Sequence, residues 1–205
     1  MEPIVKLENI RMNYESRLIF HDLSYSFVNG IYVLKGVSGI GKTTLLNVIS
    51  GYVKCLDGKV SIATGKKISY LFQEALLFHN LTVSENLYMK YHVKEQEDLL
   101  FKQRIKGITE ELQISNLLDK KVALLSGGEK QRVQLAVSSL DDADILLMDE
   151  PVSNVDDENM EKILSYIKKI SKNKLIVIVS HQPIPFSMEY QLLELREGKL
   201  YEVER

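Results

Sequence analysis

The stretch GVSGIGKT, residues 36–43, has the residue types and the spacing of a loop that holds phosphate groups. The apolar run IYVL precedes it and the helix-forming stretch KTTLLNVIS follows it, which is the context such a loop needs. Its three glycines let backbone N–H groups approach one phosphate without interference from a Cβ atom. We expect Lys42 to reach the β- and γ-phosphates and the Thr43 hydroxyl to bind Mg²⁺.

Two carboxylates end the apolar stretch ILLMDE, residues 145–150. In a parallel sheet the ligand crevice lies at the carboxyl edge of the strands, so both acids are expected near the phosphate loop. Asp149 suits a metal ion, bound directly or through water, and Glu150 suits a base that positions an attacking water. The alternative is that Asp-Glu-Pro only ends a strand and begins a turn.

Three more residues are placed where they could reach the same crevice. His181 follows the apolar run KLIVIVS, and Gln73 follows the strand-like ISYLF. Tyr14, expected in the loop after the first strand, could stack on a nucleotide base. From the residues alone each keeps a structural alternative: a surface histidine, an ordinary strand-end amide, and an aromatic ring that covers a sheet edge. His21, His79 and His92 have no spacing that suggests a metal site.

The stretch LSGGEKQR, residues 125–132, predicts a second anion site. Ser126 occupies an N-cap position and two glycines follow it, so the helix is expected to begin with bare backbone N–H groups and a positive dipole. Because the chain already has a phosphate loop, the ligand of this second site is not evident from the stretch alone.

The elements that must position these residues follow from the apolar pattern. The runs IVKLENI, RLIF and LSYSF predict short antiparallel strands with turns between them, and KVSIA and ISYLF predict two strands joined by a turn at ATGKK. Residues 81–121 predict several short helices, and strands then alternate with helices up to a closing hairpin at 191–203. The expected fold is α/β, with a mainly parallel sheet, an N-terminal antiparallel β subdomain and a small helical subdomain over roughly 74–140.

Composition limits the remaining possibilities. The 205 residues are expected to form a single domain over 1–205. A net charge of −2 gives no basic field for nucleic acid, and no apolar run is long enough to span a membrane. The single cysteine, Cys55, and the lack of a leader-like segment favour the cytosol.

Taken in order, these motifs resemble the ATP-binding subunit of ATP-binding cassette (ABC) transporters along the whole chain. GVSGIGKTT, FQE, LSGGEKQR, ILLMDEP, SNVD and VSH are similar to the Walker A, Q-loop, signature, Walker B, D-loop and H-loop of that family. The Walker A pattern occurs in many nucleotide-binding proteins. LSGG before QR, shortly ahead of a Walker B strand, is far more specific to this family.

The resemblance implies roles that the residues alone left open. Glu150, His181 and Gln73 would be catalytic, and Thr43, Gln73 and Asp149 would surround Mg²⁺. Asp156 matches the D-loop aspartate. The implied nucleotide-binding set is Tyr14, Gly36, Ser38, Gly39, Gly41, Lys42, Thr43, Thr44, Ser126, Gly127 and Gly128. In this family the last three close over the ATP of a second subunit, so the second anion site would serve another molecule.

Three features depart from the common family pattern. Val137 stands where an arginine is frequent, the D-loop reads Ser-Asn-Val-Asp, and only thirty residues separate Lys42 from Gln73. The first affects packing more than chemistry, and the second can alter contacts across a dimer. The third predicts that the entry sheet is trimmed to a simple hairpin in this region.

The expected cofactors are ATP and Mg²⁺, and the expected partners are membrane-spanning permease subunits and a second copy of the chain, without nucleic acid. The chain would lie peripherally on the cytoplasmic face of the cell membrane. The apolar segment Leu76–Phe78 is expected either to contact a permease or to pack the helical subdomain. The sequence after the Q-loop is similar to that of importers, whereas the signature is closer to that of exporters. The direction of transport therefore stays open. A soluble ABC ATPase of the chromosome, repair or translation type is the alternative function, and a module that gates a partner without hydrolysis is disfavoured by Glu150 and His181.

Overall fold

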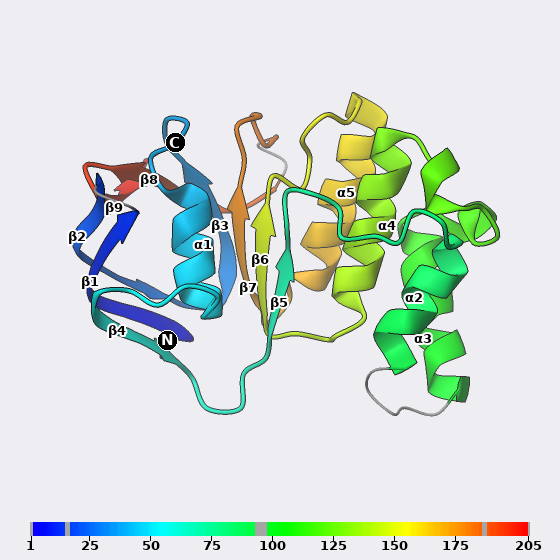
Figure 1. Cartoon of the computed structure of the whole chain (residues 1–205), viewed down its shortest axis with the longest axis horizontal. Coiled ribbons are helices and arrows are strands. Elements are labelled where there is room, and N and C mark those ends of the chain that lie inside the picture. The colour runs from blue at the N-terminus through cyan, green and yellow to red at the C-terminus, as the bar shows by residue number, and fades with distance from the viewer. Residues whose placement is uncertain (1, 15–16, 93–97, 186–187, 205) are drawn as a thin grey trace. The chain divides into compact units, whose positions relative to one another are not determined.

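The computed structural model describes residues 2–14, 17–92, 98–185 and 188–204. The chain divides into two compact units, the first made of residues 1–70, 143–150 and 171–205 and the second of residues 71–142 and 151–170. Figure 1 shows that the first unit holds the sheets and the second holds most of the helices. That they form a single functional domain stays a prediction.

The first unit begins with a three-stranded antiparallel sheet in the order β2-β1-β4, made of β1 (Val5–Tyr14), β2 (Arg17–Phe27) and β4 (Asp57–Ile62). The prediction of two separate strands at RLIF and LSYSF was wrong, because β2 runs through both. Ile10 pairs with Leu23 and Met12 with Phe20, so β2 carries one extra residue, and Asp22 takes a positive φ of 53°. This bulge accommodates the polar His21–Asp22 pair without breaking the ladder.

The second sheet has six strands in the order β5-β6-β7-β3-β8-β9. Its strands are β3 (Gly30–Lys35), β5 (Ile68–Leu71), β6 (Ile145–Asp149), β7 (Leu175–Val179), β8 (Gln191–Arg196) and β9 (Lys199–Val203). β7 pairs in parallel with both β3 and β6, β8 pairs in parallel with β3, and β8 and β9 form the predicted hairpin. The predicted mainly parallel sheet with an antiparallel β subdomain is therefore confirmed.

The strands β4 and β5 do not form the predicted hairpin, because they belong to different sheets. Contacts with Asp144, just before β6, fix the segment that connects them. Lys66 forms an ion pair with the Asp144 carboxylate at 2.8 Å, and the Lys67 N–H donates to the same carboxylate at 3.0 Å. The turn-forming residues thus carry the chain from one sheet to the other instead of folding it back.

A continuous apolar core joins the two sheets to helix α1 (Lys42–Ser50). Leu45, Leu46, Val48 and Ile49 of the helix are buried among residues of β1, β2, β3, β6 and β7. Burial of these side chains fixes the helix, and hence the loop before it, against the parallel strands.

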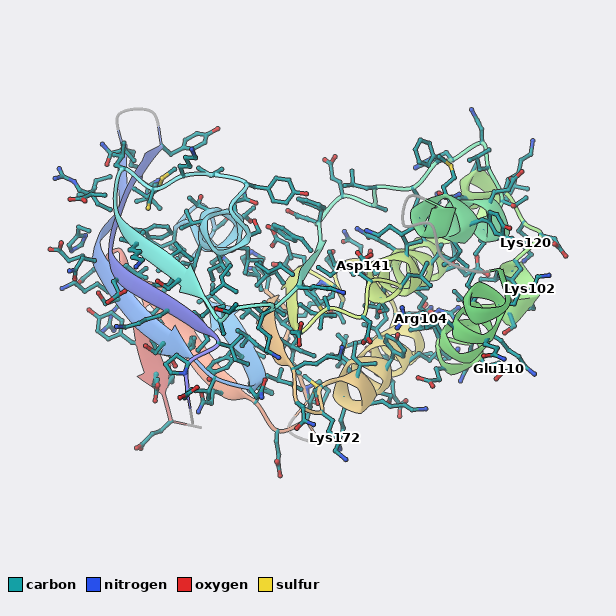
Figure 2. All side chains as sticks on the ribbon, turned by 90° about the horizontal axis from the view of Figure 1, so that it is seen from below. Lys102, Arg104, Glu110, Lys120, Asp141 and Lys172 are labelled. Carbon is teal, nitrogen blue, oxygen red and sulfur yellow. The ribbon has the colours of Figure 1, made fainter. Side chains whose placement is uncertain are left out.

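The second unit contains α2 (Val83–His92), α3 (Asp98–Glu111), the 3₁₀ turns η1 (Ser115–Leu117) and η2 (Val122–Leu124), α4 (Gly127–Ser139) and α5 (Asp157–Ile170). The helix α4 contacts α2, α3 and α5. Arg104 of α3, labelled in Figure 2, donates to the Leu140 carbonyl at the end of α4. The side chain of Arg132 on α4 donates to the carbonyls of Leu112 and Gln113 just after α3, both at 2.8 Å.

The helix α5 is amphipathic, with apolar residues at three- and four-residue spacing on one face. Ile163, Leu164 and Ile167 are buried, and Met160 and Ile170 are half-buried. Among the residues that the structure describes, none of the helices combines the length and the apolar character needed to cross a bilayer.

Candidate functional site

The loop between β3 and α1 is shaped as an anion cradle. Gly41 at the N-cap of α1 has φ 113°, and no side chain caps the helix. A Cβ atom on Gly41 would collide with the Ile19 side chain, so both the backbone angle and the packing require glycine here. Because no side chain satisfies the first N–H groups of α1, they stay available to a bound anion.

The side chain of Lys42 lies beneath this loop. It is buried, and its Nζ atom donates to the carbonyls of Gly36 at 2.9 Å and Val37 at 3.1 Å. Burial lowers the pKa of Lys42, while the charges of Glu150 and Asp149 oppose that shift. The loop therefore holds a cation close to the place where phosphate groups would lie.

Parallel pairing aligns the carboxyl ends of β3, β6 and β7 at one edge of the sheet. Leu34 of β3 and Asp149 of β6 both pair with Val179 of β7. The phosphate loop, Glu150 and His181 each follow one of these strand ends, which places them at one edge of the sheet. The spatial grouping that the sequence predicted for these segments is thus observed within the first unit.

Asp149 is buried and accepts a hydrogen bond from the Thr43 side chain. Burial raises the pKa of Asp149, and the Thr43 hydrogen bond, Lys42 and His181 oppose the shift. A carboxylate and a hydroxyl in direct contact form an all-oxygen donor set of the kind that Mg²⁺ prefers. The residues present therefore fit the predicted ion.

Glu150 is held in an unusual backbone conformation. Its φ is 54°, in the left-handed region, and its N–H donates to the Val179 carbonyl at 3.0 Å. The carboxylate accepts a hydrogen bond from the His181 N–H at 3.2 Å and lies 3.3 Å from the His181 Nε2 atom. The glutamate is 4% exposed, whereas the His181 side chain is 55% exposed. Strain of this kind costs about 1–3 kcal/mol and is typical of functional sites.

Tyr14 is the last residue of β1 and is exposed, so its predicted placement in the following loop was wrong. The antiparallel pairing extends as far as Tyr14 and Arg17, which makes Tyr14 part of the strand. An exposed ring at a strand end remains compatible with base stacking.

The signature stretch lies in the second unit, and its helix end is not bare as predicted. Ser126 Oγ accepts a hydrogen bond from the Glu129 N–H at 3.2 Å, and the Glu129 carboxylate accepts one from the Ser126 N–H at 2.8 Å. The serine-x-x-glutamate spacing is the sequence signature of such a capping box, and it could have been recognised from the residues. The hydrogen bond from Ser126 lowers the pKa of Glu129, so this helix start carries a fixed negative charge.

Gln73, which follows β5 in the chain, belongs to the second unit and is exposed. Gln134 of α4, which sequence reasoning missed, holds the chain on both sides of it. The Gln134 Nε2 atom donates to the Phe72 carbonyl at 2.8 Å and to the Glu74 carbonyl at 3.3 Å. A glutamine on an otherwise buried helix face was the available signal.

The apolar segment after Gln73 divides between two roles. Leu77 is buried, whereas Leu76 and Phe78 are 68% and 57% exposed. The amide of Asn86 on α2 binds the N–H and the carbonyl of Phe78. The segment is thus fixed to the helical unit through its backbone and through Leu77, with two large apolar side chains left outside.

Comparison with known proteins decides the family. The family model described as "ABC transporter" matches residues 20–153, about two thirds of the chain. The chain belongs to the ABC transporter family. It is an ATP-binding subunit that hydrolyses ATP to power transport across a membrane, and the non-transport alternative is not favoured.

Relatives of this ABC protein cover nearly its whole length. It is 30% identical to the phosphonates import ATP-binding protein PhnC of Fusobacterium nucleatum, over 98% of this chain and 92% of that protein. It is 25% identical to the ABC transporter ATP-binding protein YxdL of Bacillus subtilis, over 98% and 86%. A solved dimeric ATP-binding cassette in a post-hydrolysis state, bound to ADP and Pi, is 25% identical with a TM-score of 0.83, covering 98% of each chain.

Proposed function

We propose that two copies of this ABC subunit sandwich two ATP molecules between them while docked on a membrane-spanning permease pair, at the cytoplasmic face of the membrane. ATP binding would close the dimer and move the permease, and hydrolysis would reopen it. The observation that carries the proposal is the cluster of Lys42, Thr43, Asp149, Glu150 and His181 at one edge of the parallel sheet.

Within this cluster the uncapped start of α1 and Lys42 hold the phosphates. The N–H groups of the loop and the Lys42 ammonium would each donate to phosphate oxygens, which favours the charge that develops during transfer. Tyr14 would stack on the adenine ring. Thr43 and Asp149 would hold Mg²⁺, which would supply neutralising charge for the phosphates, and a role of Gln73 at this ion stays a prediction.

Glu150 and His181 act on the reacting groups. The Glu150 carboxylate, fixed by its backbone conformation, would accept a hydrogen bond from the attacking water. The exposed His181 imidazole can turn from Glu150 toward the γ-phosphate. Ser126, Gly127 and Gly128 of the opposite copy would complete the charge stabilisation, because the capping box engages the N–H groups of Ser126 and Glu129 and leaves those of Gly127 and Gly128 to a phosphate oxygen.

The central experiment replaces Glu150 with glutamine. Glu150→Gln keeps the shape but removes the carboxylate, so hydrolysis should fall about 100-fold or more while ATP binding persists. Size-exclusion chromatography with ATP should then show a trapped dimer. The matched control is Glu110→Gln, because Glu110 is an exposed residue of α3 (Figure 2) and should leave turnover unchanged. Turnover that survives Glu150→Gln would remove the proposed role of this residue.

The permease is proposed to dock on the exposed apolar surface of the helical unit. An open groove of roughly 600 Å³ is lined by Leu81, Ser84, Glu85, Tyr88 and Met89. The exposed side chains of Leu76 and Phe78 precede these residues in the chain, and the backbone of Phe78 is bound to Asn86 of α2. Such exposed apolar side chains are costly without a partner, whereas a helix of the permease could bury them.

Paired charge substitutions test this docking surface. Leu76→Glu with Phe78→Glu should abolish co-purification with the permease and leave ATP binding by the isolated chain unchanged. Leu56→Glu, on the first unit, is the control because Leu56 is 64% exposed. Co-purification that tolerates the paired substitutions would contradict the proposed surface.

A further inference from the structure

We infer that Asn159 is a positioning residue that fastens the D-loop to the start of the signature helix, so that the two stretches meet the partner subunit as one rigid edge. The inference deepens the proposed function, in which the signature stretch completes the ATP site of the opposite copy, and it adds the D-loop to that interface. All of the contacts that support it lie within the second unit.

Asn159 first fixes the D-loop aspartate. Its backbone N–H donates to Asp156 Oδ1 at 2.8 Å, and its Nδ2 atom donates to both carboxylate oxygens, at 3.0 and 2.8 Å. The Asp156 carbonyl also accepts from the Met160 N–H, so Asp156 is the N-cap of α5. A carboxylate with both oxygens engaged by one neighbour cannot turn freely, and the hydrogen bonds from Asn159 lower the pKa of Asp156.

The same amide fills the space beside the signature helix. A Cβ atom on Gly128 would lie 2.6 Å from Asn159 Nδ2, 2.7 Å from its Cγ and 3.1 Å from its Cβ. The backbone of Gly128 is in an ordinary helical conformation, since its φ is not positive. Glycine at 128 is therefore required by the neighbouring amide and not by the backbone angle.

Gly127 provides the contrast. A Cβ atom there would meet only the Asn154 carbonyl, at an ordinary 3.7 Å. Nothing within the described part of the chain excludes a side chain at 127, which leaves this position open toward a second molecule. The adjacent glycines thus serve different purposes: one admits Asn159, and the other leaves the helix end open.

The helices α4 and α5 lie side by side in Figure 1, and their contacts join the two helix starts. Asn159 spans this junction, with its amide bound to the Asp156 carboxylate and packed on Gly128. Any shift of the D-loop must consequently move the signature backbone, and the reverse also holds. Loss of the side chain would let the two stretches shift separately, without removing a group that touches ATP.

The first test is Asn159→Ala. Asp156 can still cap α5 through the backbone N–H, so the fold should persist and ATP binding by the isolated chain should not change. ATP-dependent dimerisation and kcat should fall at least about tenfold, because small misplacements of a catalytic edge are expensive in rate. Asn116→Ala, on the exposed η1 turn, is the matched control and should leave kcat unchanged. An unchanged kcat in Asn159→Ala would overturn the inference.

The second test is compensation between two positions. Gly128→Ala should lower both thermal stability and kcat, because its Cβ displaces the hydrogen-bonded amide. Combining it with Asn159→Ala removes the obstacle, so stability and kcat should recover to the levels of Asn159→Ala alone. Recovery of both supports the junction. A double variant as unstable and inactive as Gly128→Ala alone would overturn it.

Recovery of stability is measured on the monomer without ATP, so it does not depend on the proposed function. If stability recovers while wild-type protein fails to dimerise with ATP, the junction stands and the sandwich dimer fails. If the wild type dimerises and stability does not recover, the sandwich stands and the junction fails.

Discussion

The two helix starts that carry the phosphate-binding motifs are built in opposite ways. The helix α1 begins after Gly41 with positive φ and no side-chain cap, above a buried lysine. The helix α4 begins with a reciprocal capping box between Ser126 and Glu129, with neither of its glycines at positive φ. The first start is an anion site that its own chain leaves open. The second is partly satisfied by its capping box, and the Glu129 carboxylate repels anions.

This difference teaches that a glycine-rich helix start is not by itself a nucleotide site. At α1 the unsatisfied N–H groups and the cation favour a phosphate without help from another chain. At α4 a phosphate must overcome the Glu129 charge, and only part of the helix end is free. The second start therefore suits a ligand that another subunit already holds by stronger contacts.

The largest expected difference concerns stability. Gly41→Ala combines a strained φ with a collision against Ile19, and should lower the free energy of unfolding by about 2–4 kcal/mol. Gly127→Ala places the same methyl group in helical backbone with ordinary contacts, and should raise the free energy of unfolding by up to about 1 kcal/mol. Urea unfolding of the two variants measures both changes. Equal losses would remove the contrast between the two starts.

The second largest effect is expected on ATP affinity, which should fall after substitution at the start of α1 and not after substitution at the start of α4. Lys42→Ala removes a charge-assisted hydrogen bond and should weaken ATP binding by the isolated chain about 10- to 100-fold. Ser126→Arg adds bulk at the start of α4 and should leave that binding nearly intact while blocking ATP-dependent dimerisation and turnover. Isothermal titration calorimetry and size exclusion measure the two effects. A loss of monomer affinity in Ser126→Arg would mean that both motifs serve one chain.

Much of this architecture was accessible from the sequence because the relevant patterns are local. The phosphate loop lies between an apolar strand and a helix, and Asp149, Glu150 and His181 follow apolar strands whose parallel pairing brings their ends level. The capping box is also encoded locally, by the serine-x-x-glutamate spacing, although the two glycines favour the interpretation of a bare helix end. Each of these features can be predicted from residues that are close together in the sequence.

What sequence reasoning missed depends on contacts between distant segments. The residues between β4 and β5 have the composition of a hairpin turn. In the structure they bind Asp144, nearly eighty residues further along the chain, and β4 and β5 lie in different sheets. The polar pair His21–Asp22 suggested a turn, whereas tertiary pairing absorbed it as a bulge. Gln134 and Asn159 act on backbone that they meet only in the folded unit. No single-sequence pattern encodes such partners.

The smallest expected effect is a pH dependence confined to the second start. The hydrogen bond from Ser126 lowers the folded-state pKa of Glu129 below its usual value of 4.5. The ionised carboxylate therefore stabilises the fold above about pH 4.5, and this stabilisation is lost as the pH falls through the lowered folded-state value. Because the group is largely solvated, the contribution should be only about 0.5 kcal/mol.

Glu129→Gln isolates the contribution of the carboxylate charge, because the amide oxygen can still accept a hydrogen bond from the Ser126 N–H but does not titrate. Chemical unfolding of wild type and variant at pH 7 and pH 3.5 should show a difference that shrinks at the lower pH. The same substitution removes the charge that opposes an incoming phosphate, so ATP-dependent dimerisation should strengthen. The start of α1 has no capping carboxylate, and Glu161→Gln, on the exposed side of α5, serves as the control. A Glu129→Gln variant that dimerises no better than this control would show that the capping charge does not oppose the partner's nucleotide.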